Sequence, residues 1–272
     1  MRRASLRLAF SFAILGWSFA IAAVASAQDW DVIRGAKSAA SSDKNVAAQS
    51  SDNDSDEVPP LIVTGDFNRD GIADIARIIL HAEDTSEPDH LIVLLGQANG
   101  TSSTATSKAL FGPTPRAIVG GDFNNDRIPD LIVGNEDGQL TLFLGDGAGN
   151  FNSSHEITRL NSAASIAVAD FNNDGMLDIA VSDWRMSSVT VLLGAGKGSF
   201  GHSWSFPLRM RGTKPHIAAA DFNGDSVPDL AVIYDQDEGD TFDVMLGNGN
   251  GTFTLSPERG LVRNPNSHCN IL

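Results

Sequence analysis

The chain has 272 residues, of which 42% are hydrophobic, and its 34 acidic and 19 basic residues give a formal net charge of −15. This hydrophobic content is typical of a folded protein and excludes a disordered polymer, while the acidic balance makes nucleic acid and anionic membranes poor partners. Twenty-six glycines, eleven prolines and short runs of Val, Ile, Leu and Phe favour many brief strands joined by tight turns.

Residues 1–27 have the features of a secretory signal peptide. Arg2, Arg3 and Arg7 form a basic start, an apolar stretch follows, and Ala25-Ser26-Ala27 supplies a small-residue cleavage pattern. We therefore expect a secreted protein, extracellular or periplasmic. Cleavage would leave 16 basic against 34 acidic residues, a net charge of −18. An uncleaved anchor stays an alternative, because the apolar stretch is about long enough to span a bilayer.

Residues 28–58 are rich in Ser, Ala, Asp and Asn and have no sustained hydrophobic period, which predicts a flexible linker. Residues 263–272 form a short C-terminal tail that contains Cys269, the only cysteine. A secreted form would therefore have no intrachain disulfide to stabilise it.

Between these segments the chain repeats one acidic nonapeptide four times. The copies are DFNRDGIAD at 66–74, DFNNDRIPD at 122–130, DFNNDGMLD at 170–178 and DFNGDSVPD at 221–229. Their starts lie 56, 48 and 51 residues apart, which indicates an array of units of similar length. We place the four units at about 59–112, 113–160, 161–208 and 209–262.

Each unit has the same order of predicted elements. An apolar strand precedes the nonapeptide, a second apolar strand follows it, and a third ends in a glycine-rich turn before a more polar fourth strand. The first strands are expected at 61–65, 117–121, 165–169 and 216–220, the second at 75–80, 131–134, 179–182 and 230–233, and the third at 90–96, 139–145, 188–194 and 241–247. Three buried strands and one polar outer strand predict an all-β array of four antiparallel blades, as in a β-propeller.

The segment AIVGGDFNNDRIPDLIVGNEDGQLTLFLGDGAGNF, residues 117–151, resembles an FG-GAP or VCBS repeat, the unit of integrin α-chain propellers and of many secreted bacterial and fungal proteins. The resemblance extends over about residues 61–256. It implies that the acidic segment is a calcium-binding hairpin loop within a blade, in an array that usually closes into a ring of about seven blades. Only four units are present here, so ring closure stays open.

The nonapeptides place oxygen side chains at positions one, three, five and nine. A backbone carbonyl at position seven would add to them, and calcium prefers six to eight oxygen ligands. The sequence therefore predicts up to four calcium sites, whose ligands are Asp66, Asn68, Asp70, Ile72 and Asp74; Asp122, Asn124, Asp126, Ile128 and Asp130; Asp170, Asn172, Asp174, Met176 and Asp178; and Asp221, Asn223, Asp225, Val227 and Asp229.

The four loops differ at position six, where the chain turns sharply and a positive φ is expected. Gly71 and Gly175 suit this conformation, whereas Arg127 and Ser226 should cost about 1 kcal/mol or more there. The loops at 66 and 170 are therefore the best predicted calcium sites. A metal-free alternative is that Asp and Asn only cap turns, but this does not explain why three mutually repelling aspartates recur in each loop.

Phenylalanines of the loops and of the glycine-rich turns are expected to pack between blades. Those of the loops are Phe67, Phe123, Phe171 and Phe222, and those after the turns are Phe151, Phe200 and Phe253. The variable inserts at 82–89, 183–187 and 235–240, with Trp184 and Tyr234, are candidate ligand contacts.

The sequence shows no catalytic constellation, so an enzyme is not the favoured interpretation. By resemblance to integrin α-chains and fungal lectins, we expect a module for binding a protein or carbohydrate, as in cell adhesion, with calcium in a structural role. One alternative is part of a secreted enzyme acting on carbohydrate or lipid, for which Arg209, Arg211 and Lys214 are the only dense basic cluster. Another is a fragment of a larger propeller, or one completed by self-association, because open blades leave strand edges exposed.

Overall fold

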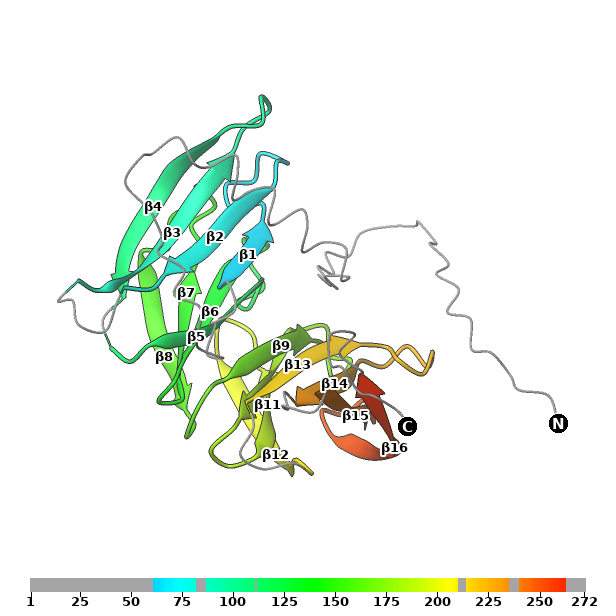
Figure 1. The fold of residues 1–272 in the computed structure, drawn as a ribbon. Helices are drawn as coiled ribbons and strands as arrows, with labels where there is room; N and C mark the ends of the chain where they lie inside the picture. The colour runs from blue at the N-terminus through cyan, green and yellow to red at the C-terminus, as the bar shows by residue number, and fades with distance from the viewer. Residues whose placement is uncertain (1–60, 82–86, 111, 210–213, 235–239, 263–272) are drawn as a thin grey trace, which may run out of the picture. The chain divides into compact units, whose positions relative to one another are not determined.

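The computed structural model describes residues 61–81, 87–110, 112–209, 214–234 and 240–262. Within these ranges the chain forms sixteen strands in four antiparallel sheets of four, each in simple sequence order (Figure 1). The same ranges contain no helix, and hence none that could span a bilayer. The predicted all-β array of four blades is confirmed.

We call the sheets blades one to four. Blade one contains β1 (Ile62–Gly65), β2 (Asp74–Ile79), β3 (Asp89–Gly96) and β4 (Ser102–Leu110). Blade two contains β5 (Pro115–Gly121), β6 (Asp130–Asn135), β7 (Gln139–Leu144) and β8 (Ser153–Arg159). Blade three contains β9 (Ser165–Ala169), β10 (Asp178–Asp183), β11 (Ser188–Gly194) and β12 (Phe200–Pro207). Blade four contains β13 (Pro215–Ala220), β14 (Asp229–Tyr234), β15 (Asp240–Gly247) and β16 (Phe253–Val262).

Burial follows the polarity of the strands. Every residue of β6 and β10 is buried, as expected for apolar strands covered on both faces, whereas β8 and β12 are mostly exposed. Their polar composition suits the outer edge of a blade. In β2 only alternate residues are buried, because no described blade precedes blade one.

Each nonapeptide joins the first two strands of its blade as a hairpin loop. The pairs that close the loops are Gly65 with Asp74, Gly121 with Asp130, Ala169 with Asp178, and Ala220 with Asp229. The ninth residue of the motif is thus the first residue of the second strand. This register places all four loops at equivalent points of their blades.

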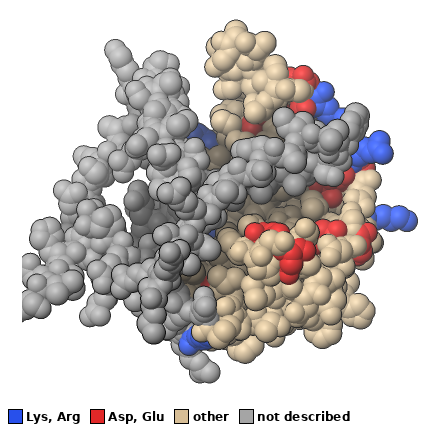
Figure 2. Space-filling model, turned by 90° about the vertical axis from the view of Figure 1, so that its right-hand side faces the viewer, with Lys and Arg blue, Asp and Glu red and all other residues tan. Residues whose placement is uncertain are grey.

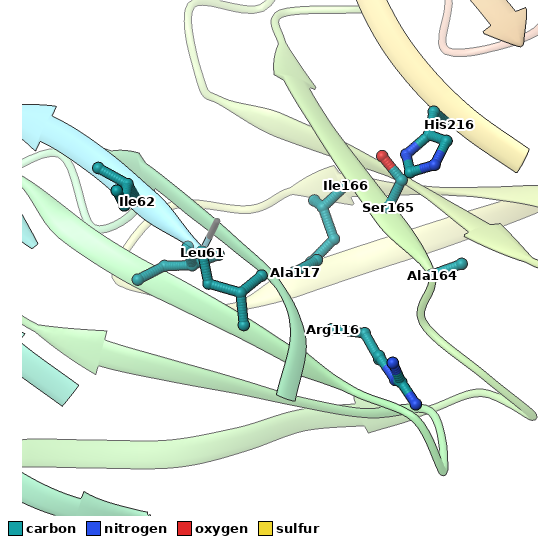
Figure 3. Close-up of a pocket in the computed structure, with 9 residues that line it drawn as sticks. Leu61, Ile62, Arg116, Ala117, Ala164, Ser165, Ile166 and His216 are labelled. Atoms are coloured by element: carbon teal, nitrogen blue, oxygen red, sulfur yellow. The ribbon is translucent and has the colours of Figure 1, made fainter. Parts of the chain in front are cut away.

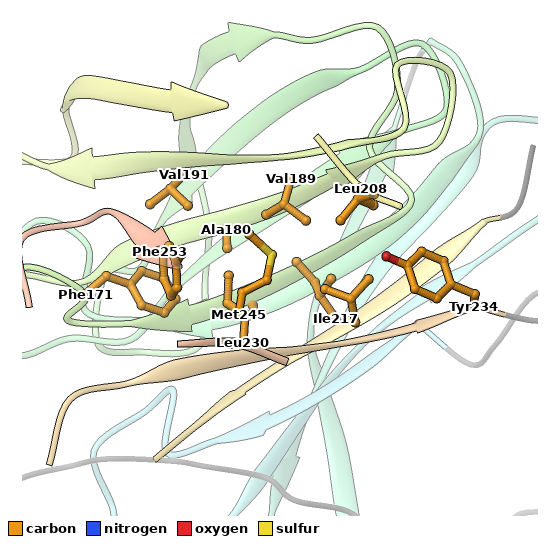
Figure 4. Close-up of a cluster of buried hydrophobic side chains, with 12 residues drawn as sticks. Phe171, Ala180, Val189, Val191, Leu208, Ile217, Leu230, Tyr234, Met245 and Phe253 are labelled. Carbon is orange, nitrogen blue, oxygen red and sulfur yellow. The ribbon is translucent and has the colours of Figure 1, made fainter. Parts of the chain in front are cut away.

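The hydrophobic core lies between consecutive blades and is divided into three clusters. One joins blades one and two, a second joins blades two and three, and a third joins blades three and four. In the third cluster Ala180 and Val191 of blade three face Leu230, Met245 and other side chains of blade four (Figure 4). Each blade is therefore stabilised by its neighbours, as is typical of repeat arrays.

Phenylalanine pairs cross each of these boundaries. The ring centroids lie 5.6 Å apart for Phe67 and Phe151, 6.2 Å for Phe123 and Phe200, and 5.3 Å for Phe171 and Phe253. The prediction that these residues pack between blades is confirmed for the six. It is wrong for Phe222, which is 50% exposed, because no described blade follows blade four.

Candidate functional site

The first aspartate of each nonapeptide accepts hydrogen bonds from the backbone of its own loop. In the first loop Asp66 accepts the N–H groups of Asp70 and Gly71, both at 3.0 Å. The other loops repeat this pair of bonds at 2.8 to 3.2 Å. In the fourth loop the bond from the Ser226 N–H is the main cause that lowers the pKa of Asp221. The carboxylate thus organises the loop around itself.

The third, fifth and seventh residues form a second network. The Asn68 side-chain amide donates to Asp70 Oδ2 at 2.8 Å, while Asn68 Oδ1 accepts the Asp70 N–H at 3.0 Å. Asp70 Oδ1 in turn accepts the Ile72 N–H at 2.8 Å. The same bonds occur in the other three loops. The seventh residue, predicted as a ligand through its carbonyl, is therefore anchored through its N–H group.

The ninth aspartate is the least accessible member of the motif. Asp74, Asp130, Asp178 and Asp229 are all 0% exposed. In the first loop Asp74 Oδ2 accepts the Phe67 N–H at 2.8 Å. Its Oδ1 accepts the N–H of Gly96, at the end of β3, also at 2.8 Å. Equivalent bonds of 2.7 to 3.0 Å occur in the other loops.

This aspartate therefore joins the loop, the second strand and the end of the third strand. Sequence reasoning assigned it only to the metal and missed this structural role. The signal was present in the glycine that ends each predicted third strand, at residues 96, 145, 194 and 247.

Burial and neighbouring charge act together on the ninth aspartate of the second and third loops. The pKa of Asp130 rises from 3.8 to about 6, mainly because the carboxyl is buried, and its two backbone hydrogen bonds only partly oppose this. The carboxylates of Asp126 and Asp122 raise it further. Asp178 has the same shift for the same kinds of cause.

Acidic side chains also gather in groups on the face of the molecule drawn in Figure 2.

Left-handed backbone occurs at position six of every loop, as predicted. The φ angles are 82° for Gly71, 68° for Arg127, 83° for Gly175 and 69° for Ser226. Position four is left-handed as well, which the sequence analysis did not anticipate, at Arg69, Asn125, Asn173 and Gly224. The second loop has no glycine at either position and therefore carries the most backbone strain.

The donor chemistry of the loops fits calcium. Among the described residues no three Asp, Glu, His or Cys side chains are already grouped so that they could hold a metal ion. The loop carboxylates accept N–H groups instead. Each carboxylate oxygen has two lone pairs, so an oxygen that accepts one N–H group keeps capacity for a cation. Asp221 Oδ1 differs, because it accepts the N–H groups of both Gly224 and Asp225. A divalent ion would also offset the repulsion from neighbouring carboxylates, which adds to the rise in pKa that burial causes at Asp130 and Asp178.

A shallow cavity of about 130 Å³ lies between the innermost strands of the blades. Figure 3 shows its lining, in which Leu61, Ala117 and Ile166 are apolar and Arg116, Ser165 and His216 are polar, with Ser165 beside His216. Arg116 donates to Glu136 at 2.6 and 3.2 Å, and this interaction lowers the pKa of Glu136. No sequence motif predicts this cavity, because its residues come from different units.

The predicted contact residue Tyr234 is not on the surface. It is 0% exposed, and its hydroxyl donates to Asp243 Oδ2 at 3.1 Å. The prediction is wrong because Tyr234 is the last residue of β14 and its side chain packs against blade three. Trp184 is half-buried and lies beside the Arg185 guanidinium. Of the other two predicted inserts, at 82–89 and 235–240, residues 82–86 and 235–239 lie outside the described residues.

One residue of the predicted basic cluster, Arg209, has a structural role. Arg209 donates to Asp243 Oδ1 at 3.1 Å and to the Ser256 carbonyl at 2.8 Å, so it joins the end of blade three to β15 and β16. Arg211 lies outside the described residues. Arg209 is thus committed to packing between blades three and four.

The chain was compared with curated proteins, solved structures and protein families. A search of curated proteins finds no match to the chain. A solved structure on recognition of non-reducing terminal N-acetylglucosamine by an Agrocybe aegerita lectin is similar at 16% identity and a TM-score of 0.42, over 72% of this chain. The chain spans 66% of that lectin chain, which is less than two thirds. The FG-GAP-like repeat family matches residues 66–133, 122–181 and 175–232. Since these matches run over more than half of its length, the chain belongs to the FG-GAP-like repeat family.

Proposed function

We propose that this chain is a secreted, calcium-stabilised repeat protein whose blades bind a protein or glycan ligand, as in adhesion. The observation that carries the calcium part is the buried ninth aspartate, which recurs in all four loops. Burying an ionised carboxylate is costly unless it is paired. Among the described residues, no ion pair includes any of these four aspartates. Each of them instead has two further aspartates in its own nonapeptide, so a cation is needed to balance the charge.

In each loop the ligands would be the carboxylates of positions one, five and nine, the amide oxygen of position three and the carbonyl of position seven. Calcium bound there supplies a divalent positive charge that neutralises the clustered carboxylates. The loops are short and built of oxygen donors without a rigid octahedral frame, which favours calcium over magnesium.

The role proposed for calcium is structural. The ninth carboxylate accepts N–H groups from position two of its loop and from the glycine that ends the third strand. An ion that keeps this carboxylate ionised strengthens both hydrogen bonds, because bonds to a charged acceptor are stronger than neutral ones. Calcium would therefore stabilise the blade as a whole.

Thermal melting of the full chain with and without millimolar calcium tests this proposal. We expect calcium to raise the melting temperature, and magnesium at the same concentration to raise it less. In calorimetric titrations Asp170→Asn should remove one site, whereas Asp137→Asn, in a turn outside the nonapeptides, should leave the stoichiometry unchanged. A melting temperature indifferent to calcium and to chelator would overturn the calcium sites.

The ligand-binding part is supported by the cavity between the inner strands. It brings Arg116, Ser165 and His216 to one place beside apolar side chains, a mixture that suits a sugar or a polar peptide side chain. Saturation-transfer NMR with a panel of neutral and acidic monosaccharides tests whether the chain binds glycans. Binding that Ser165→Ala weakens would support the cavity as the site, and binding unaffected by both Ser165→Ala and Arg116→Ala would exclude it.

A further inference from the structure

Each glycine-rich turn of blades two to four is seated on the nonapeptide loop of the preceding blade. The third glycine of the turn donates its N–H to the carbonyl of the loop phenylalanine, and the phenylalanine two residues later packs against that loop's ring. The backbone bonds are Gly149 to Phe67 at 3.0 Å, Gly198 to Phe123 at 3.1 Å and Gly251 to Phe171 at 3.0 Å. We call the turn with its phenylalanine the glycine knob, and the loop that receives it the socket.

A side chain at the third glycine of the knob would approach a leucine of the preceding blade closely. A Cβ atom at Gly149 would lie 2.7 Å from Leu95 Cδ2, and one at Gly251 would lie 2.7 Å from Leu193 Cδ2. Both glycines also have a positive φ, of 82° and 79°. A Cβ atom at Gly198 would lie 2.9 Å from Leu142 Cδ2. At each boundary a leucine on the third strand of the preceding blade thus forms the wall of the socket. The same hydrogen bond and the same close approach of glycine to leucine therefore occur at all three boundaries between described blades.

Blade one has no glycine knob. Its Gly100 donates to Gln97 within the same turn at 2.9 Å, and a Cβ atom there would meet nothing within 4 Å. Ser102 stands where the other blades have phenylalanine. On the face that would meet a preceding blade, exposed Arg77 stands where blade two has buried Val133. The first blade therefore does not offer the complement that a socket requires.

Blade four has a complete socket that receives no glycine knob from the described residues. Its loop is built like the others, since Asp229 accepts the Phe222 N–H at 3.0 Å. Phe222 is 50% exposed, whereas the equivalent phenylalanines of the other loops are at most 4% exposed. Leu246 takes the place of Leu95 in the wall of the socket, and Ile233 on the same blade is 36% exposed.

We propose that the socket of blade four binds a glycine knob, of the form Gly-x-Gly-x-Gly-x-Phe, supplied by another polypeptide that carries repeats of this kind. The occupant follows from the three equivalent sockets, each of which holds this element. The proposal deepens the protein-binding role proposed above and rests on that role, but it requires neither calcium nor the inner cavity.

Two other occupants fit less well. A second copy of this chain has its three glycine knobs engaged within itself, and its first blade presents Ser102. The segments outside the blades, residues 1–60 and 263–272, contain phenylalanine only at positions 10, 12 and 19, with no glycine pair before them. Neither of these two sources therefore offers a free glycine knob.

The test uses the full chain and a backbone-cyclised peptide of residues 190–205, which contains the glycine knob of blade three. Cyclisation is needed because an isolated hairpin is only marginally stable, and cross-strand contacts between Thr190 and Ser205 in NMR spectra verify its fold before use. We expect saturable binding in calorimetry with one peptide per chain. Phe222→Ser in the chain, and separately Phe200→Ser in the peptide, should each weaken binding about tenfold or more.

Phe222→Ser should leave the melting temperature of the chain nearly unchanged, because the ring is half exposed, so lost binding would not reflect unfolding. Absence of binding by the folded peptide, or binding indifferent to Phe222→Ser, would overturn the proposal. So would dimerisation of the chain in light scattering that Phe222→Ser abolishes, because it would assign the socket to a second copy. The titration is repeated without calcium, so that a failure of the calcium sites and a failure of the socket are seen separately.

Discussion

The ninth aspartate of each nonapeptide combines two roles. It is a buried acceptor for two backbone N–H groups. It is also a carboxylate that lies close to the carboxylates of positions one and five. The hydrogen bonds favour the ionised form, whereas burial and the neighbouring charges oppose it. For Asp130 and Asp178 the opposing effects are larger, so in the absence of metal their ionisation destabilises the fold.

This balance predicts an unusual pH dependence for the calcium-free protein. An acid whose pKa is higher in the fold than in the unfolded chain binds its proton more tightly in the fold, so a rising pH destabilises the fold between the two values. For Asp130 and Asp178 this window runs from 3.8 to about 6. The melting temperature without calcium should therefore fall as the pH rises from about 4 to about 6.5.

Circular dichroism melts over this pH range, with and without calcium, check the prediction. Asp178→Asn should make the pH dependence shallower, because one of the two titrating groups is removed. With calcium in excess the fall should disappear, since the metal keeps both carboxylates ionised and its binding strengthens as they lose their protons. A calcium-free melting temperature that rises steadily through this window would contradict the raised pKa values.

Position in the array decides the cost of losing a loop phenylalanine. Phe171 is 1% exposed and packs edge-on against Phe253, whereas Phe222 occupies the same place in its motif and is 50% exposed. Phe171→Ala should cost about 3 kcal/mol of unfolding free energy or more, and Phe222→Ala less than about 1 kcal/mol. Urea denaturation of the two variants measures the difference, and equal costs would show that Phe222 is covered in solution.

At the scale of elements, the glycine-rich turn is both the end of one hairpin and a contact with the next blade. Backbone hydrogen bonds and close glycine contacts therefore join consecutive blades in addition to their apolar side chains. The ninth aspartate holds the base of the same turn through the glycine that ends the third strand. A change in the loop therefore reaches the neighbouring blade through a chain of bonded elements.

A pair of matched glycine substitutions separates the contact from the turn conformation. Gly251→Ala and Gly100→Ala both place a side chain at a φ of about 80°, which costs about 1 kcal/mol in each. Only at Gly251 would the new Cβ atom also meet Leu193, at 2.7 Å. We therefore expect Gly251→Ala to cost about 1 to 3 kcal/mol more than Gly100→Ala in chemical denaturation. Equal costs would mean that the Leu193 side chain or blade four moves to accommodate the new atom.

At the scale of the whole molecule, local features were predictable and features set by a residue's place in the array were not. Hydrophobic runs, acidic loops and glycine-rich turns are local patterns, so the sixteen strands and the hairpin position of the nonapeptides follow from the sequence. The burial of Tyr234 and the exposure of Phe222 depend on whether a neighbouring blade covers them. The hydrogen bond from the Gly96 N–H to Asp74 joins residues 22 positions apart, and no single sequence motif contains both residues.

The excess negative charge of the molecule leads to a last prediction. The net charge of −15 repels itself in the compact state, and the acidic loops concentrate that repulsion. Salt screens such repulsion, so the calcium-free melting temperature should rise between about 0.05 and 0.5 M sodium chloride. Calcium neutralises the same carboxylates, and the calcium-loaded chain should therefore respond less to salt. Sodium chloride is used because sulfate also strengthens apolar burial, and because magnesium can itself bind the loop carboxylates. Equal salt responses with and without calcium would place the destabilising charge outside the loops.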